Sequence, residues 1–463
     1  MKLVHKEYLG ISRADGPIII IENTDMIGYN ELVEITDQHG RVRHGTVLEV
    51  AENYAAIQVF EGTYGLSQRD TRVKFLGHTM SIGVSPNMLG RIFNGTGVPI
   101  DGHPAPASEK SIDVNGMSIN PVCREYPVNF IQTGISGIDG LNTLVRGQKL
   151  PIFTGAGLPH NEIATQIVKN AQIGTGENFI IVFAAMGVKH DDADFFMKEF
   201  HQAGAFNRVI LFLNLADDPT IERLFTPRAA LTVAEYYAFE LNYHVLVIMT
   251  DMTNYCEALR EIATAREEIP SRKGYPGYMY SDLASLYERT GRIKGKNGSI
   301  TQIPILSMPN DDITHPIPDL TGYITEGQIV LSRELHAKNI FPPIEELPSL
   351  SRLMKDCIGG EMTRADHPNL ASQLYAAYAN VQSVRALASV IGEEELSETD
   401  KKYLKFGDKF ERVFVGQGYT NRTIQETLDT GWSLLSILPR DELTRVSEEQ
   451  IRQYYQINLD ENL

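Results

Sequence analysis

The stretch 150–162 constrains the fold most, because an apolar strand, a turn of small residues and a helix start follow one another within it. We expect the strand over 150–154 and the helix over 161–171, with Gly155 and Gly157 in the turn between them. A turn of this kind surrounds phosphate with backbone amides when it follows the pattern G-x-x-x-x-G-K-[ST], in which the Lys reaches the terminal phosphates.

The polar groups of that pattern are replaced in this chain. His160 stands at the Lys position and fits a helix-capping role equally well, while Asn161 stands at the Ser/Thr position. Pro159 stands where the last Gly belongs, so the loop also loses one N–H donor. Early in the helix, Glu162 would repel a bound anion. We therefore predict a nucleotidase-like subunit that does not hydrolyse ATP, with a degenerate loop that binds nucleotide weakly or not at all. The candidate contacts of that loop are Gly155, Gly157, His160 and Asn161.

Apolar strands and helical stretches alternate through the middle of the chain. The expected strands are Leu150–Thr154, Phe179–Ala184, Val209–Leu213, Val245–Thr250 and Ile303–Leu306. Helical stretches such as 231–240 lie between them. This alternation predicts a doubly wound parallel sheet, on which ligands bind at the carboxyl ends of the strands. The loops after Thr154, Ala184 and Thr250 are therefore where we expect the site.

The two ends of the chain differ from this middle. The first 75 residues hold short β-rich runs separated by Gly, Asn and Asp, a pattern typical of a small barrel or sandwich. From about residue 365 the chain is helical, beginning with 371–391, which contains neither Pro nor Gly. The remaining helical stretches are 401–415 and 422–438.

Composition narrows the possible functions. At 463 residues the chain is long enough for two or three domains. Its net charge of −17 at pH 7 argues against a general nucleic-acid binder, which would carry a basic patch. It has no run of 18 apolar residues, so we expect any membrane role to come through partners. The three cysteines lie far apart without metal-binding spacing, which indicates free thiols in a reducing cytoplasm.

Several longer motifs resemble one family. Residues 90–101 (GRIFNGTGVPID) are similar to the entry segment of rotary ATPase head subunits, and 132–149 to the segment before their phosphate-binding loop. The loop 153–162 (FTGAGLPHNE) resembles the altered loop of the B subunits of vacuolar and archaeal-type (V/A-type) ATPases. The segments 270–280 (PSRKGYPGYMY) and 347–353 (LPSLSRL) resemble the same subunits. The resemblance extends over essentially the whole chain and identifies it as similar to this non-catalytic, regulatory subunit.

This resemblance implies a fold of three domains. They are an N-terminal β-barrel (1–75), a central α/β P-loop-type nucleotide-binding domain with a mainly parallel sheet (76–362), and a C-terminal α-helical domain (363–463). It also implies a ring in which three such subunits alternate with three catalytic A subunits around a central stalk, with a peripheral stalk outside. The head so formed is cytoplasmic and peripheral to the membrane, and it couples ATP hydrolysis or synthesis to H⁺ or Na⁺ transport.

The resemblance further assigns roles to single residues. Arg352 matches an arginine finger that enters the neighbouring catalytic site, where ATP or ADP binds with Mg²⁺. Arg272 and Tyr275 lie in a loop expected at the same interface. Asp251 ends a strand that resembles a Walker B strand, although the missing hydroxyl ligand in the loop favours a role in capping a helix or organising its loop. Val188 stands where catalytic members carry a Glu that orients water, and valine cannot take a proton.

Other readings remain compatible with parts of the sequence. The acidic segment Glu393–Asp400 resembles the loop by which such subunits contact the central stalk, and a charge run of this kind is also typical of a solvated face. A self-sufficient P-loop ATPase would need the Lys that His160 replaces and the Glu that Val188 replaces. A purely structural scaffold would hold the ring together without needing Arg352 for turnover.

Overall fold

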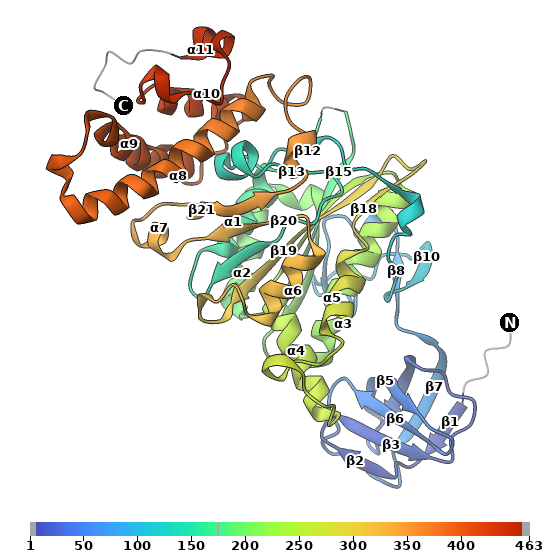
Figure 1. Ribbon diagram of the computed structural model, residues 1–463. Coiled ribbons are helices and arrows are strands. Elements are labelled where there is room, and N and C mark those ends of the chain that lie inside the picture. Colours follow the sequence, from blue (N-terminus) through green and yellow to red (C-terminus); the bar gives the residue numbers. More distant parts are fainter. Residues whose placement is uncertain (1–5, 175, 456–463) are drawn as a thin grey trace.

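The computed structural model describes residues 6–174 and 176–455. Its N-terminal part is a seven-stranded antiparallel sheet in the order β1-β7-β4-β5-β6-β3-β2, curved around its own core (Figure 1). The strands are β1 (Lys6–Leu9), β2 (Arg13–Asp15), β3 (Ile18–Glu22), β4 (Glu31–Thr36), β5 (Val42–Val50), β6 (Tyr54–Val59) and β7 (Arg72–Thr79). Alternate residues point inward, so that Val33 and Ile35 of β4 pack with Val47 and Ile57. This is the N-terminal β-barrel domain that the sequence predicts.

The central part is built on a mainly parallel sheet in the order β21-β20-β14-β19-β17-β15-β16-β9. The strands on this path are β9 (Ile92–Asn94), β14 (Ile152–Gly155), β15 (Phe179–Val188), β16 (Val209–Leu215), β17 (His244–Thr250), β19 (Ser299–Met308), β20 (Gly327–Leu331) and β21 (Ile344–Ser351). Strand β21 is antiparallel to β20, and the other neighbours on the path are parallel. Shorter strands pair outside it: β8 (Ser81–Val84), β10 (Lys110–Asp113), β11 (Arg124–Glu125), β12 (Phe130–Ile131), β13 (Leu144–Val145) and β18 (Gly291–Ile293). The five strands expected from the sequence are confirmed as β14, β15, β16, β17 and β19.

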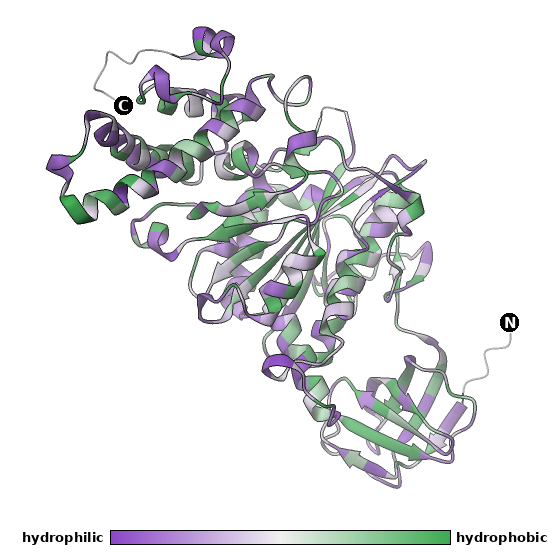
Figure 2. Cartoon of the chain, viewed as in Figure 1, coloured by the Kyte–Doolittle hydropathy of each residue, from purple (hydrophilic) through white to green (hydrophobic). Residues whose placement is uncertain are grey.

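Helices cover both faces of the central sheet (Figure 1). They are α1 (His160–Asn170), α2 (His190–Gln202), α3 (Thr220–Glu235), α4 (Met252–Ala265), α5 (Met279–Tyr287), α6 (Pro316–Ile324) and α7 (Arg333–Ala337). Alternate residues of β15 enter different cores: Ile181 and Phe183 pack with α1 and α2, whereas Val182 and Ala184 pack with α3 and α4. The strands are accordingly hydrophobic along their length (Figure 2). The sheet is therefore doubly wound, as the sequence predicts.

The C-terminal part is helical, with α8 (His367–Ile391), α9 (Glu398–Lys409), α10 (Ile424–Leu435) and α11 (Glu448–Tyr454). Two predicted helices differ in detail. The stretch 231–240 is the end of α3, which begins at Thr220, contains Pro227 and continues as the π-helical turn Tyr236–Glu240. The stretch 401–415 combines most of α9 with the π-helical turn Phe410–Val415. Within residues 6–174 and 176–455, no helix is long and apolar enough to cross a bilayer.

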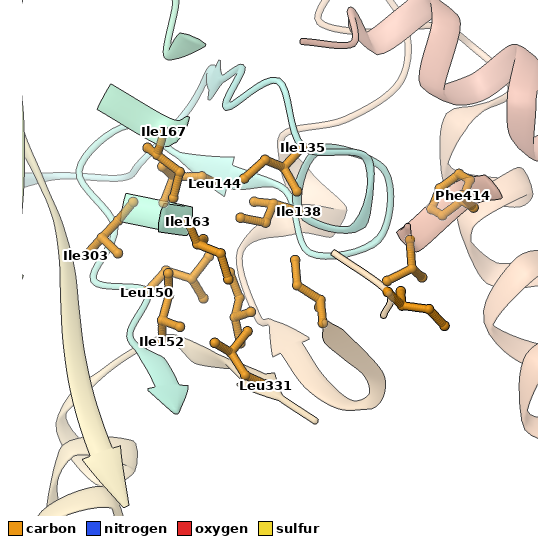
Figure 3. Packing of buried hydrophobic residues seen from close by; sticks show 14 of the residues in the cluster. Ile135, Ile138, Leu144, Leu150, Ile152, Ile163, Ile167, Ile303, Leu331 and Phe414 are labelled. Atoms are coloured by element: carbon orange, nitrogen blue, oxygen red, sulfur yellow. The ribbon is translucent and has the colours of Figure 1, made fainter. Parts of the chain in front are cut away.

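The C-terminal helices join the central domain through the segment before β14. Figure 3 shows Ile135 and Ile138 of this segment in the same buried cluster as Phe414 from the C-terminal side. The Ser136 amide donates to Gln417 Oε1 at 2.6 Å. Beside this joint, Glu346 of β21 is buried, and its Oε2 accepts from Asn142 Nδ2 at 2.8 Å. Burial raises the pKa of Glu346 well above its ordinary value of 4.5, although the bond from Asn142 acts in the opposite direction.

Replacing Gly327 by Ala is expected to destabilise the fold where β20 meets β21. Gly327 has φ +144°, and a Cβ there would lie 2.0 Å from the Leu350 carbonyl oxygen. We expect Gly327→Ala to cost about 1–3 kcal/mol of unfolding free energy, because backbone must move to relieve the contact. Thermal unfolding checks this, with Gly277→Ala as the control because a Cβ there meets nothing within 4 Å. Equal melting temperatures for the two variants would contradict it.

Glu346→Gln is expected to change how stability depends on pH. Because the folded state raises the pKa of Glu346 above 4.5, the neutral carboxyl stabilises the fold fully below that pH, and this contribution is lost as the pH rises through the folded-state value. The wild type should therefore lose stability relative to Glu346→Gln as the pH rises above 4.5, by at most about 1.4 kcal/mol per pH unit. Thermal melts of both proteins from pH 5 to pH 8 measure the difference, and parallel curves would exclude a raised pKa.

Candidate functional site

Pro159 folds the degenerate loop back on itself. It stands between β14 and α1 with φ −82° and ψ 53°, close to the geometry of an inverse γ-turn. The His160 amide donates to the Leu158 carbonyl oxygen at 2.9 Å, and His160 Nδ1 lies 3.0 Å from the same oxygen. Both the backbone donor and the side chain at the expected Lys position therefore face the loop itself.

Two further polar groups of the loop region are bonded within the protein. The Leu158 amide donates to the Gly155 carbonyl oxygen at 3.1 Å. Asn161 Nδ2 donates to Asp192 Oδ1 at 3.1 Å, so the side chain at the expected Ser/Thr position is paired with a carboxylate. Glu162 adds a second carboxylate in the first turn of α1. The frame of the loop is present as predicted, but it offers an anion little positive charge and few free amides.

Asp251 organises the end of β17. Its side chain accepts from the Thr253 amide at 2.8 Å, which makes it the N-cap of α4. It also accepts from the Ser307 amide at 3.2 Å and from the Ser307 hydroxyl. These bonds confirm the prediction that Asp251 caps a helix and organises its loop.

Val188 lies buried at the end of β15, against the core that α1 and α2 share. The neighbouring Gly187 amide donates to Asn214 Oδ1 at 3.1 Å, and Asn254 Nδ2 donates to the Met186 carbonyl oxygen at 2.9 Å. The Arg223 guanidinium also lies here, since its Nε donates to Asn214 Oδ1 at 2.9 Å. The strand end is therefore lined by amides, aliphatic groups and one arginine. Among the described residues, no group of three or more His, Cys, Asp and Glu side chains could hold a metal ion.

Arg352 follows β21 and has an exposed side chain. Its backbone amide donates to the Glu326 carbonyl oxygen at 2.9 Å, which fixes the base of the residue. Within the described ranges, no hydrogen bond or ion pair joins its guanidinium to another side chain. The nearby Glu326 carboxylate is instead held by Lys149, whose Nζ lies 3.0 Å from Oε1 and whose amide donates to Oε2 at 2.8 Å. The backbone of Arg352 is therefore fixed, while its guanidinium has no side-chain partner among the described residues.

The sheet separates Arg352 from the degenerate loop. Ser351 pairs with Gly327 at the amino end of β20, whereas the degenerate loop follows the carboxyl end of the parallel neighbour β14. The five residues of β20 span about 13 Å between these edges. Arg352 and the loop at Gly155 thus belong to opposite edges of the sheet.

Arg272 and Tyr275 are neighbours in sequence with different surroundings. Arg272 is exposed, and its guanidinium donates to the Thr314 carbonyl oxygen at 3.0 Å and to Asp319 Oδ2 at 3.2 Å. Tyr275 is buried, its hydroxyl donates to Glu257, and its ring lies edge-on to His315. Burial and the Glu257 contact raise the pKa of Tyr275. Both residues line a pocket of about 160 Å³.

The sequence motifs do not point to two further charged residues beside the loop. Arg333 begins α7, and Asp311 follows β19; the two form a bidentate ion pair with distances of 2.8 and 2.9 Å beside the degenerate loop. Each is among the first charged residues after a strand of the parallel sheet. Because sites form at the carboxyl ends of such strands, this position in the sequence could have identified both residues.

Comparisons with known proteins cover nearly the whole chain. The ATP synthase alpha/beta family matches by its nucleotide-binding domain over residues 134–351 and by its beta-barrel domain over residues 11–77. The C-terminal domain of V and A type ATP synthase matches over residues 356–455. The V-type ATP synthase beta chain of Halothermothrix orenii (strain H 168) is 59% identical over 462 residues, which cover 99% of this chain and 100% of that protein. A solved structure of the ATP synthase subunit NeqB from Nanoarcheaum equitans shares 43% identity and a TM-score of 0.73, over 91% of this chain and 98% of that one.

Restoring the loop's donors should restore binding of phosphate groups. We expect the double variant Pro159→Gly, His160→Lys to bind ADP or ATP about tenfold to a hundredfold more tightly than the wild type. The substitutions release the backbone amide at 160 and add a cation. A hydrogen bond to a charged group is worth about 1.5–3 kcal/mol, which corresponds to this gain in affinity. Calorimetric titration of the full chain measures this. Pro219→Gly is the matched control, because Pro219 also caps a helix, α3, away from the loop. Equal affinities of double variant and wild type would show that other features block the loop.

Proposed function

The chain belongs to the ATP synthase alpha/beta family and carries the C-terminal domain of its V and A types, and on that basis we propose that it is the non-catalytic, regulatory B subunit of a V/A-type rotary ATPase. In such a head it alternates with catalytic A subunits in a three-plus-three ring. The complex couples ATP hydrolysis or synthesis to H⁺ or Na⁺ transport. The observation that carries this proposal is Arg352, which is exposed, has no side-chain partner within residues 6–174 and 176–455, and follows the edge of the sheet opposite the chain's own loop.

The chain's own loop does not fit a magnesium nucleotide. The His160 amide and ring face Leu158, and the Asn161 side chain is paired with Asp192. An amide side chain in place of a hydroxyl also removes the usual Mg²⁺ ligand of such loops. We therefore assign no catalytic step to this loop, and we place ATP or ADP with Mg²⁺ at the interface with the A subunit.

Arg352 acts on the nucleotide of the neighbouring A subunit in this proposal. Phosphoryl transfer develops charge on the equatorial oxygens of the transferred group, and a planar guanidinium stabilises that charge through paired N–H donors. The backbone of such an arginine must be fixed, and its guanidinium must not be bound to another group of its own chain. The bond from the Arg352 amide to Glu326 and the capture of the Glu326 carboxylate by Lys149 meet both requirements. Arg272 would lie at the same interface, with Tyr275 supporting its loop from within.

The C-terminal domain is the part that we assign to the central stalk. Val390 at the end of α8 is 81% exposed, and Figure 2 shows this end of the helix as hydrophobic. The acidic segment follows, with residues 393–395 in a 3₁₀ turn and residues 398–400 in the first turn of α9. An apolar tip beside a carboxylate cluster suits a partner with both apolar and basic groups. A peripheral stalk outside the ring and a cytoplasmic position at the membrane complete the proposed assembly.

Arg352→Ala is expected to lower ATP turnover of a reconstituted ring by about 10³-fold or more, the range typical of arginine fingers. Arg352→Lys should recover little of this, because an ammonium lacks the planar fork. The measurement is steady-state ATP hydrolysis of rings assembled with the A subunits, after size-exclusion chromatography has shown normal assembly.

The matched control for this experiment is Lys355→Ala, which removes an exposed cation from the 3₁₀ turn just after Arg352. It should leave turnover within about twofold of the wild type. Near-normal turnover of Arg352→Ala would favour a purely structural scaffold instead. Turnover by the chain without A subunits would favour a self-sufficient ATPase, which the loop geometry and the buried Val188 oppose.

A further inference from the structure

The order of the parallel strands brings three separate segments to one edge of the sheet. Strand β14 lies between β19 and β20, and all three run in the same direction. Their carboxyl ends continue into the degenerate loop, the segment Pro309–His315 and helix α7, respectively. The loop is therefore flanked on one side by Pro309–His315 and on the other by the start of α7.

Arg333, the first residue of α7, joins these three segments. Its guanidinium makes the bidentate pair with Asp311, and its Nη2 also donates to the Ala156 carbonyl oxygen in the degenerate loop at 3.0 Å. A Cβ on Gly155 would lie 2.1 Å from Asp311 Oδ1, so the pair needs a glycine at this position. The charge and hydrogen bonds of Arg333 hold the pKa of Asp311 below its ordinary range. Bidentate geometry and shared partners distinguish this contact from an isolated surface ion pair.

The segment Pro309–His315 extends this contact to the loop that carries Arg272. Asn310 and Asp311 have φ +58° and +55°, a left-handed backbone that persists where the surroundings impose it. Asp312 accepts from Lys273 Nζ at 3.2 Å. As described above, Arg272 donates to the Thr314 carbonyl oxygen. One short segment thus contacts both the degenerate loop and the loop expected at the subunit interface.

The other end of α7 is anchored on the C-terminal domain. Lys338, directly after the helix, lies 3.4 Å from Glu411 Oε2 in the π-helical turn Phe410–Val415. Burial alone would raise the pKa of Glu411, but Arg385 of α8, together with Lys338, keeps it below its ordinary range. The Phe341 carbonyl oxygen accepts from the Gly418 amide at 2.8 Å, and the Phe341 ring lies 4.6 Å from the Tyr419 ring.

From this arrangement we propose that α7 is a strut that couples the C-terminal helical domain to the carboxyl edge of the sheet, with Arg333 and Lys338 as its two positioning residues. A helix of five residues is too short to bend between its ends, so a displacement of the C-terminal anchor is passed to Asp311 and the degenerate loop. The coupling is a property of this chain alone. Its use in a rotary head, where a stalk displaces the C-terminal domain, rests on the proposed function.

Hydrogen exchange of the full chain tests the strut from both ends. Arg333→Gln should accelerate exchange at the far, C-terminal end, at the amides of Gly416 and Gly418, which donate to Glu411 and Phe341. Lys338→Gln should accelerate exchange at the loop end. The reporting amides there are Leu158, His160, Asp312 and His315, each with a defined hydrogen bond. We expect about two- to fivefold faster exchange, which is the effect of losing one partly exposed ion pair. The change should be of similar size in both variants, because coupling between two sites is reciprocal.

Two controls separate coupling from general loosening. Lys401→Gln removes a cation of α9 that pairs with Glu398 and does not belong to the strut, and it should leave both sets of amides unchanged. Lys338→Arg keeps the charge and should behave as the wild type. Amides of β15 and β17 in the sheet interior serve as an internal reference for global stability.

The proposal is overturned if each substitution changes exchange only at its own end of α7, or if Lys401→Gln produces the same pattern. Exchange that spreads equally into β15 and β17 would show global destabilisation and would also overturn it. This experiment needs neither A subunits nor Arg352. The strut can therefore be confirmed even if the arginine-finger assignment is wrong, and it can be overturned even if that assignment is right.

Discussion

The common direction of β20, β14 and β19 is the constraint on which the rest of the site depends. Parallel strands place all of their carboxyl ends at one edge, so the loop after β14 must meet whatever follows its two neighbours. The antiparallel return of β21 carries the chain back to the opposite edge and leaves Arg352 there. One sheet therefore presents two chemically distinct edges: one carries a loop bonded within its own chain, and the other carries the exposed Arg352.

Electrostatics keeps that cation free. Lys149 has a side chain that is only 4% exposed, and a buried ammonium must be paired. Its Nζ contacts the carboxylates of both Glu288 and Glu326, and the Glu326 carbonyl oxygen accepts from the Arg352 amide. Because Lys149 holds the Glu326 carboxylate, that carboxylate does not pair with the Arg352 guanidinium. An acidic chain can in this way retain a surface arginine that has no side-chain partner in the part of the chain that the structure describes.

Local features of this site could be predicted from the sequence, and features that depend on strand order could not. The position of the loop, the start of α1 within one residue of the expected Asn161, and the capping role of Asp251 follow from short-range patterns. The pair of Arg333 and Asp311 joins residues far apart in sequence, and only the order β20-β14-β19 brings them together. Domain limits at 75 and 362 stay predictions, although β7 continues to Thr79.

The retained glycines of the degenerate loop now have a structural explanation. Gly157 has φ +79°, which a side chain would strain, and it allows the turn that brings the Leu158 amide to the Gly155 carbonyl oxygen. Gly155 admits Asp311, which in turn holds Arg333 against Ala156. A loop that has lost its phosphate-binding groups can therefore keep its glycine pattern for reasons of packing alone. The pattern then marks where the sheet is tied to α7, and nucleotide binding has to be judged from His160, Asn161 and the turn at Pro159.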